Sequence, residues 1–369
     1  LNTIIGGNES NEIEFSSVDD SSTITISYSN IAGGQDSIIT NDNGTVSWGN
    51  GSLDTDPRFV NPNSSNYHLL ANSLCINAGH PDSTDSDGTV ADMGAYPYLN
   101  SYSGPTWYIT ESGNDTTGTG ASDDPFRSIQ AGINFSSDVD SVTVAVGTYV
   151  ENINFRGRNI KVVGADRETT IIDGSNSDYS VVTIESESGA LPMLSGFTIQ
   201  NGIGIGNTNG YGGGIYSSGN TILENLIVRD NNNIMGGGFC LDGGSPIVRN
   251  CLIKNNYSSY VGAGIACTGG DPIISNVTLI NNSGGGGLGL KASGNDNSYA
   301  IVTNSVFYNN GENNDIKFIE SNEDIGNRLE ISYSMIINGQ NNINITDNDT
   351  ITWGSGNIDV EPMFVDTAN

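Results

Sequence analysis

Residues 225–230 read Asn-Leu-Ile-Val-Arg-Asp, and the chain returns to this pattern three more times. The later copies are Asn-Cys-Leu-Ile-Lys-Asn at 250–255, Asn-Val-Thr-Leu-Ile-Asn at 276–281 and Asn-Ser-Val-Phe-Tyr-Asn at 304–309, so successive starts lie 25, 26 and 28 residues apart. The segments alternate in β-branched and polar residues and are separated by turns rich in glycine and asparagine. This pattern predicts an all-β solenoid with rungs of about 24–28 residues.

In such a solenoid each rung stacks in parallel on the next, so equivalent side chains form columns. The pattern predicts two inward columns, which are Leu226, Cys251, Val277 and Ser305, and Val228, Ile253, Leu279 and Phe307. Where the strands end, an amide side chain can bond to a tight turn and to the amide above it. We therefore expect an asparagine ladder at Asp230, Asn255, Asn281 and Asn309.

This pattern resembles that of right-handed parallel β-helix proteins of the pectate-lyase-like superfamily. The resemblance covers most of the chain and implies the fold and its right-handed winding. It implies no particular activity, because one fold hosts many unrelated functions.

Residues 107–136 resemble the opening of many secreted bacterial β-helix proteins, in the sequence Gly-Asn-Asp followed by Pro-Phe-Arg-Ser-Ile-Gln. Phe126, Ile129 and Ile133 fall at helical spacing behind two aspartates. This predicts a short amphipathic helix near 126–134 whose dipole is answered by acidic residues. Such a helix would cap the open edge of the first coil.

Residues 73–95 begin with Ser-Leu-Cys-Ile-Asn-Ala-Gly and end with Asp-Gly-Thr-Val-Ala-Asp-Met-Gly-Ala. They resemble the closing segment of large bacterial surface β-helix proteins, which carry a choice-of-anchor-type C-terminal segment. Leu74 stands where those proteins usually have proline, and Asn77 where they usually have aspartate. The resemblance implies a secreted protein at the cell surface.

A second repeat has a longer period. Ile-Ser-Tyr-Ser occurs at 26–29 and 331–334, Trp-Gly at 48–49 and 353–354, and Pro-x-Phe-Val at 57–60 and 362–365, each pair 305 residues apart. We interpret the chain as a window from a tandem array. In this interpretation 1–98 is the end and closing segment of one β-helix, and 99–106 is a linker. Residues 107–369 are the next β-helix, with its cap at 107–136 and coils at 141–345, and it stops before its closing segment.

Acidic residues dominate the charge, with 42 Asp and Glu against 12 Lys and Arg and a net charge of −30. Such a surface repels nucleic acid and anionic membranes, so we expect neither as a partner and no direct membrane insertion. The expected partners are neighbouring repeats of the same or identical chains, and extracellular polysaccharide. The four cysteines fit no zinc pattern. Cys251 and Cys267 occupy core positions, and Cys240 could form a disulfide.

The best metal candidate is the closing segment, where Asp85-x-Asp87-Gly88 places alternating carboxylates on a turning backbone. Calcium needs several hard oxygen ligands, and Asp82 and Asp92 could add to them. No glutamate closes the loop as in an EF-hand, so a bound Ca²⁺ would be structural. The alternative is an Asp-rich turn held by its own hydrogen bonds.

Arg229 and Lys254 occupy equivalent outward positions on adjacent rungs and could form a small basic patch, with Tyr257 and Tyr308 nearby as sugar-binding aromatics. A lyase of this fold would need carboxylates that bind calcium beside such a base. No aspartate cluster surrounds this pair in the sequence, and we assign no catalytic residues. The only histidines are His68 and His80, away from the regular rungs.

Three functions remain open. The tandem unit and the acidic surface favour a non-catalytic, extracellular structural or adhesive repeat of a cell-surface protein or filament. The fold alone suggests a polysaccharide lyase or another carbohydrate-active enzyme, which is weak support. A carbohydrate-binding module that uses one face of the solenoid is the third.

Overall fold

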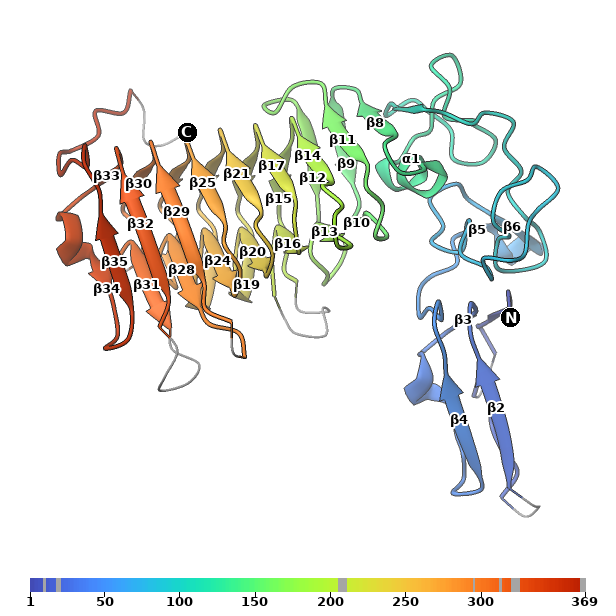
Figure 1. The fold of residues 1–369 in the computed structure, drawn as a ribbon. Helices are drawn as coiled ribbons and strands as arrows, with labels where there is room; N and C mark the ends of the chain where they lie inside the picture. The colour runs from blue at the N-terminus through green and yellow to red at the C-terminus, as the bar shows by residue number, and fades with distance from the viewer. Residues whose placement is uncertain are drawn as a thin grey trace. The chain divides into compact units, whose positions relative to one another are not determined.

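Three parallel sheets form the walls of a β-helix in the second part of the chain, which confirms the predicted fold class (Figure 1). The computed structural model describes residues 1–8, 11–17, 21–204, 211–294, 296–311, 314–319 and 326–365. Contacts divide the chain into two compact units, Leu1–Ser136 and Ser137–Asn369, and each is described by itself. The linker expected at 99–106 lies inside the first unit, and the tandem-array interpretation stays a prediction.

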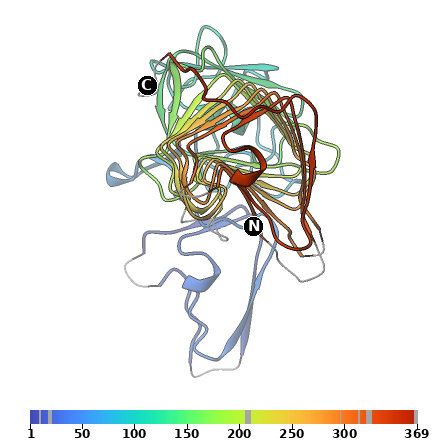
Figure 2. The same cartoon turned by 90° about the vertical axis from the view of Figure 1, so that its left-hand side faces the viewer.

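In the second unit the coils stack directly on one another, which is visible along the axis in Figure 2. Sheet 1 contains, in order, β8 (Ser141–Val144), β11 (Lys161–Gly164), β14 (Met193–Ser195), β17 (Ile222–Glu224), β21 (Ile247–Arg249), β25 (Ile273–Ser275), β29 (Tyr299–Thr303), β32 (Arg328–Ser332) and β35 (Thr350–Trp353). Sheet 2 contains β9 (Gly147–Val150), β12 (Thr170–Asp173), β15 (Thr198–Gln200), β18 (Ile227–Arg229), β22 (Leu252–Lys254), β26 (Thr278–Ile280), β30 (Val306–Tyr308) and β33 (Met335–Ile336). Sheet 3 contains β10 (Ile153–Asn154), β13 (Val182–Glu185), β16 (Ile215–Ser218), β20 (Phe239–Asp242), β24 (Ile265–Thr268), β28 (Leu288–Lys291), β31 (Ile316–Ile319) and β34 (Ile343–Asn344), and η3 (Gly339–Asn342) joins β33 to β34.

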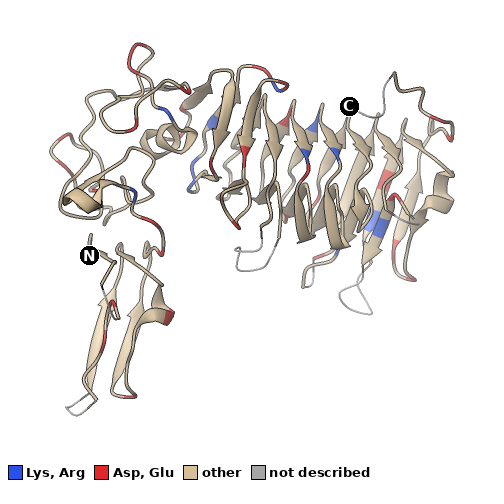
Figure 3. Ribbon diagram, turned by 180° about the vertical axis from the view of Figure 1, so that it is seen from behind, with Lys and Arg blue, Asp and Glu red and all other residues tan. Residues whose placement is uncertain are grey.

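Lys and Arg positions are few on these coils, and Asp and Glu positions are scattered among them (Figure 3). Within the described residues, no helix is long and apolar enough to cross a membrane.

The two predicted inward columns lie in the core. Val228 pairs with Ile253, Ile253 with Leu279, and Leu279 with Phe307, in register along sheet 2. The other column precedes these strands and is also buried, at 0% to 3% exposure for Leu226, Cys251, Val277 and Ser305. Short alternating segments can bury one face this way because successive side chains of a strand point to opposite sides.

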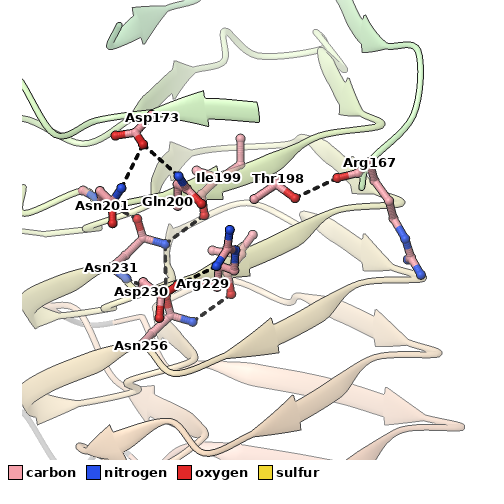
Figure 4. A network of polar contacts seen from close by, with 12 residues as sticks. Arg167, Asp173, Thr198, Ile199, Gln200, Asn201, Arg229, Asp230, Asn231 and Asn256 are labelled. Carbon is pink, nitrogen blue, oxygen red and sulfur yellow. Dashed lines mark hydrogen bonds and ion pairs between the residues drawn. The ribbon is translucent and has the colours of Figure 1, made fainter. Parts of the chain in front are cut away.

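Two of the predicted ladder residues do bond, since the amide of Asn309 donates to Oδ1 of Asn281 at 2.6 Å, but the continuous asparagine ladder lies one residue further along than predicted. Asp230, Asn255, Asn281 and Asn309 adopt the left-handed conformation, with φ between 54° and 57°. Asn and Asp tolerate this conformation, which turns the chain sharply at the corner. The residue after each corner therefore points inward, and the buried ladder consists of Asn231, Asn256, Asn282 and Asn310 (Figure 4 shows its first two members).

A small fourth sheet, here called the side sheet, covers the outer face of sheet 3. It consists of β19 (Asn232–Met235), β23 (Tyr257–Val261) and β27 (Ser283–Gly284). Met235 and Val261 pack with Cys240 and with Ala266 of sheet 3. Gly289 leaves room for the side sheet, because a Cβ at this position would lie only 2.4 Å from Cγ2 of Val261. Rung periodicity did not predict this second layer.

The first unit begins with short parallel strands. β1 (Ile4–Ile5) pairs with β3 (Asn30–Ile31), and β2 (Ser22–Ile26) pairs with β4 (Gly44–Trp48). η1 (Gln35–Ser37) follows β3, and the core holds Ile26, Ile31 and Ile38. β5 (Phe59–Asn61) and β6 (Asn66–Leu69) then form an antiparallel hairpin that η2 (Pro62–Ser64) connects.

The two stretches related by the 305-residue offset have the same local structure. Ile26 pairs with Trp48, and Ile331 pairs with Trp353. Asn30 bridges to Leu53, as Met335 does to Ile358. The corner tyrosines also match, since φ is 46° at Tyr28 and 50° at Tyr333. The sequence repeat is therefore a structural repeat over these coils.

A short helix is present where it was predicted, but its burial and its capping differ from the prediction. α1 spans Ile129–Phe135, follows β7 (Thr106–Ile109), and is buried on every side rather than amphipathic. Asn134 donates to the carbonyl oxygens of Ala71 and Ser73, so the closing segment covers the face expected to meet solvent. The first turn holds no acidic residue. Instead, Oδ1 of Asp115 accepts the N–H groups of Arg127 and Ser128 just before the helix.

Candidate functional site

The outward column of sheet 2 brings together three of the four predicted ligand-binding residues. Arg229 pairs in register with Lys254, and Lys254 is followed by Ile280 and then Tyr308. Arg229 forms an ion pair with Asp230, at 3.1 Å from Nη1 to Oδ2 (Figure 4). Lys254 has no ion-pair partner among the described residues. The basic patch thus consists of two residues, Arg229 and Lys254, and Asp230 neutralises the charge of Arg229.

Tyr257 lies apart from this column. It follows the buried Asn256 and belongs to the side sheet, where it is 45% exposed. Tyr260 on the same strand and Ile234 on the neighbouring strand are also exposed. The side chain of Lys317 donates to the carbonyl oxygen of Tyr260 and lies 5.9 Å from the centre of its ring. Tyr257 therefore belongs to a separate aromatic surface.

A cavity of about 260 Å³ opens beside Tyr308, and we call it the corner pocket. It lies beside Asn310 of the buried ladder, at the corner between β30 and η3. Its polar lining residues are Tyr308, Asn309, Asn310, Asp315, Asn338 and Asn342. Of these, the sequence analysis singled out Tyr308 as a ligand-binding residue. The Asn-Gly-Gln-Asn-Asn run at 338–342 is the signal that could have drawn attention to the rest.

The floor of the corner pocket is a carboxylate that takes the place of an amide in the ladder. Oδ1 of Asp315 accepts the backbone N–H and the side-chain amide of Asn310, each at 2.8 Å. Oδ2 accepts the amide of Asn342 at 2.5 Å. Burial raises the pKa of Asp315 above its ordinary value, and these hydrogen bonds oppose the rise.

The rim of the pocket is held by the end of the described chain. Tyr308 packs edge-on against Phe364, with ring centres 5.8 Å apart. A hydrogen bond from its phenol to Glu361 raises the pKa of Tyr308. Asn338 is exposed and left-handed, with φ of 63°, and its backbone N–H donates to Asp359.

The predicted calcium residues serve mainly as hydrogen-bond acceptors for their own segment. Asp85 accepts the backbone N–H of Asp92 at 2.8 Å. Asp87 accepts the N–H of Thr89 and, through its other oxygen, the N–H of Asn100. Asp82 is exposed and lies 3.9 Å from His80. The part of the chain that the structure describes holds no group of three or more His, Cys, Asp or Glu side chains poised around a metal ion, and calcium remains a prediction.

Asp92 is the buried centre of this segment, at 6% exposure. Its two oxygens accept the backbone N–H groups of Asn77 and Tyr98, which lie on either side of it in the sequence. Burial raises the pKa of Asp92 to about 7, although both hydrogen bonds lower it. The arrangement matches the Asp-rich turn that was the alternative to a metal site.

All four cysteines are buried and free, so the disulfide considered for Cys240 is absent. Cys240 lies beneath the side sheet in the cluster that includes Met235 and Val261. Burial raises the pKa of the Cys251 and Cys267 thiols to about 12. These thiols therefore act as small apolar core groups rather than nucleophiles.

These observations define a parallel β-helix protein with a polar pocket at one corner of its coils. No family model matches the chain, and no curated protein matches it. Among solved structures, it is similar to pectin methylesterase from carrot, with 13% sequence identity and a TM-score of 0.40, over 69% of this chain and 80% of that one.

Proposed function

We propose that the chain is a non-catalytic structural or adhesive module of an extracellular protein built from recurring β-helix coils. One observation carries the proposal: the coils around Ile26–Leu53 and Ile331–Ile358 share their strands, register and left-handed corners. A coil design that recurs within one chain suits a scaffold that gains length by repetition.

The polar interior supports the same proposal. Each buried amide of the ladder bonds to its neighbours, as Asn256 does to Asn231 and Asn282. The carboxylates of Asp87 and Asp92 are likewise engaged by backbone N–H groups. These buried amides and carboxylates hold the coils and loops in place, as a structural module requires. The acidic surface, with a net charge of −30, suits a saline exterior.

A polysaccharide lyase is the weaker alternative. Such an enzyme needs a free base beside carboxylates that neutralise an acidic sugar. Arg229 is held by Asp230, and its neighbour Lys254 stands in a column that continues with Ile280. Only the fold supports this alternative, and a shared fold is weak evidence for a particular activity.

Carbohydrate binding without turnover is the second candidate, and the corner pocket favours it. The amides of Asn309 and Asn338 and the phenol of Tyr308 are groups that bind sugar hydroxyls in proteins, and they line one cavity. An adhesive module and a carbohydrate-binding module can be the same protein.

The test is a turnover assay of the full chain on a broad panel of acidic and neutral polysaccharides with calcium present. We expect no unsaturated uronate products and no new reducing ends. Turnover that Arg229→Ala or Lys254→Ala abolishes would refute the non-catalytic proposal. Labelling of intact source cells with an impermeant reagent tests the location, and exclusive labelling after lysis would refute an extracellular position.

A further inference from the structure

We propose that the corner pocket binds a single neutral sugar ring, which it reads with the side-chain amides of Asn309 and Asn338 and the phenol of Tyr308. This inference rests on the carbohydrate-binding candidate above and gives it a site and a ligand class. The pocket is separate from the basic column of Arg229 and Lys254, from which an acidic-sugar lyase would have been built.

The pocket lies at an irregular step of the ladder. On earlier coils each buried amide meets the next amide, as Asn256 meets Asn282 at 2.9 Å and Asn282 meets Asn310 at 2.8 Å. After Asn310 the partner is the carboxylate of Asp315, only five residues along the chain. The ladder then continues to the next coil, where Oδ1 of Asn342 accepts the backbone N–H of Asp315 at 3.0 Å, and the cavity of about 260 Å³ opens beside this irregular step. This volume lies just below the roughly 300 Å³ at which drug-sized pockets begin, which suits one ring.

The lining chemistry selects a neutral ligand. It consists of carboxamides and a phenol, which can both donate and accept hydrogen bonds, and it contains no Lys or Arg among its described residues. The nearest charges are negative, since Asp315 forms the floor and Glu361 bonds to Tyr308. An acidic sugar would be repelled there. A divalent cation is also disfavoured, because both oxygens of Asp315 already accept amide hydrogen bonds.

The repeated copy in the first unit shows that the scaffold does not need the side chains of Tyr308 and Asn338. By the 305-residue offset Asn338 corresponds to Gly33 and Asn342 to Ser37. Tyr308 corresponds to Gly6, because Ile5 and Phe307 make equivalent strand pairs. The scaffold contact is kept without them, since the backbone N–H of Gly33 donates to Asp54 at 2.8 Å and that of Asn338 donates to Asp359 at 2.8 Å. The side chains of Tyr308 and Asn338 are thus additions to the coil at one cavity. Asn342 is not, because it and Ser37 both hold the coil by donating to equivalent carbonyl oxygens, those of Ile337 and Ala32.

Asn338→Gly tests the proposal without straining the fold, because Asn338 has a φ of 63° and glycine accepts this conformation. Asn255→Gly is the matched control, at an exposed left-handed corner of another coil with φ of 56°. Tyr308→Ile is a second variant, which copies the residue that Ile280 provides on the preceding coil. Circular dichroism of each full-length variant shows whether the coils remain folded.

The probes are neutral oligosaccharides of glucose, galactose, mannose and N-acetylglucosamine, oligogalacturonate, and Ca²⁺ alone, titrated into the 369-residue chain by calorimetry and ligand-observed NMR. We expect a neutral sugar to bind, with affinity reduced about tenfold by Asn338→Gly and by Tyr308→Ile and within about twofold for the control. Binding of oligogalacturonate or Ca²⁺ alone, no binding of any probe, or equal loss in the control would overturn the inference. None of these results touches the structural proposal, which polysaccharide turnover alone would overturn.

Discussion

Replacing Asn256 by alanine tests whether the buried ladder, rather than apolar packing alone, holds the coils together. The side chain of Asn256 donates to the carbonyl oxygen of Val228 and to Oδ1 of Asn282, both at 2.9 Å. Its own Oδ1 accepts the backbone N–H and the amide of Asn231, at 3.1 and 3.0 Å. The substitution removes all four bonds, and no other partner is found in the described structure for the backbone N–H of Asn231.

At about 1 kcal/mol for each net hydrogen bond, the loss is about 4 kcal/mol. The chain has two compact units, so a single global unfolding energy is not a sound measure. Native-state hydrogen exchange of the amides in β18, β22 and β26 reports local opening instead. We expect their exchange to accelerate by about 10³-fold in Asn256→Ala.

Asn255→Gly is the neighbouring control. Asn255 is exposed and left-handed, a conformation that glycine adopts freely, so we expect a change within about 0.5 kcal/mol. If exchange in the three strands differs by less than tenfold between the two variants, the ladder does not stabilise the coils as argued.

Four further predictions concern the closing segment, the thiols and the repeat. The pKa of Asp92 is raised to about 7 from 3.8, so the folded state holds its proton more tightly than the unfolded chain does, and the closing segment should lose stability as pH rises from about 4 to about 7. Over this window the free energy of local opening of residues 77–98, measured by hydrogen exchange, should fall by up to about 4 kcal/mol. Asp92→Asn should remove most of this pH dependence. If Ca²⁺ binds there, it should protect residues 82–92 from exchange and Asp87→Asn should remove the effect, whereas identical exchange with and without Ca²⁺ would reject the site. Thiol reagents at pH 8 should leave the native protein unlabelled and modify every cysteine in denaturant, and fast native labelling would contradict the burial of Cys75, Cys240, Cys251 and Cys267. Gly51→Ala and Gly356→Ala should each destabilise their coil by about 1–3 kcal/mol, because in both copies a Cβ would lie 2.4 Å from the ring of the corner tyrosine, and unequal thermal or exchange effects would show that the copies differ in packing.

The regular coils were predictable because their physics is local and repeated. The alternation in 225–230 and its three successors fixes which side chains face inward, and the register of Val228, Ile253 and Leu279 follows from it. The ladder was misplaced by one residue because the pattern marks the corner but not its backbone conformation. A left-handed corner residue reverses which of two adjacent asparagines points inward.

Features that depend on a second layer were not predictable from periodicity. Cys240 occupies an outward position of sheet 3 and is nonetheless buried, because the side sheet folds over it. The polar face of α1 is buried for a similar reason, since Asn134 bonds to Ala71 and Ser73 of the closing segment. In both places the covering segment is distant in sequence or irregular, so no local sequence pattern predicts the burial.

The candidate site follows the same logic. Tyr308 was singled out as one aromatic in a column, but the groups that give it a cavity come from beyond its own rung. Asp315 takes the place of an amide in the ladder, and Asn338 and Asn342 arrive from the next coil. A comparison of successive rungs cannot find such a site, because it identifies only the features that the coils have in common.

Comparison of the two copies shows where they differ. These differences separate the residues that hold the coil from the residues that line the pocket. Positions that hold the coil keep their contacts in both, as Asp54 and Asp359 each accept the backbone N–H of the corner residue. Positions around the pocket do not, since Gly33 stands where Asn338 does. A repeat that keeps its backbone contacts while exchanging glycine for asparagine at the corner can carry different surface chemistry on identical coils. The repetition therefore argues for a scaffold, and the departure from it marks where a scaffold acquires a ligand.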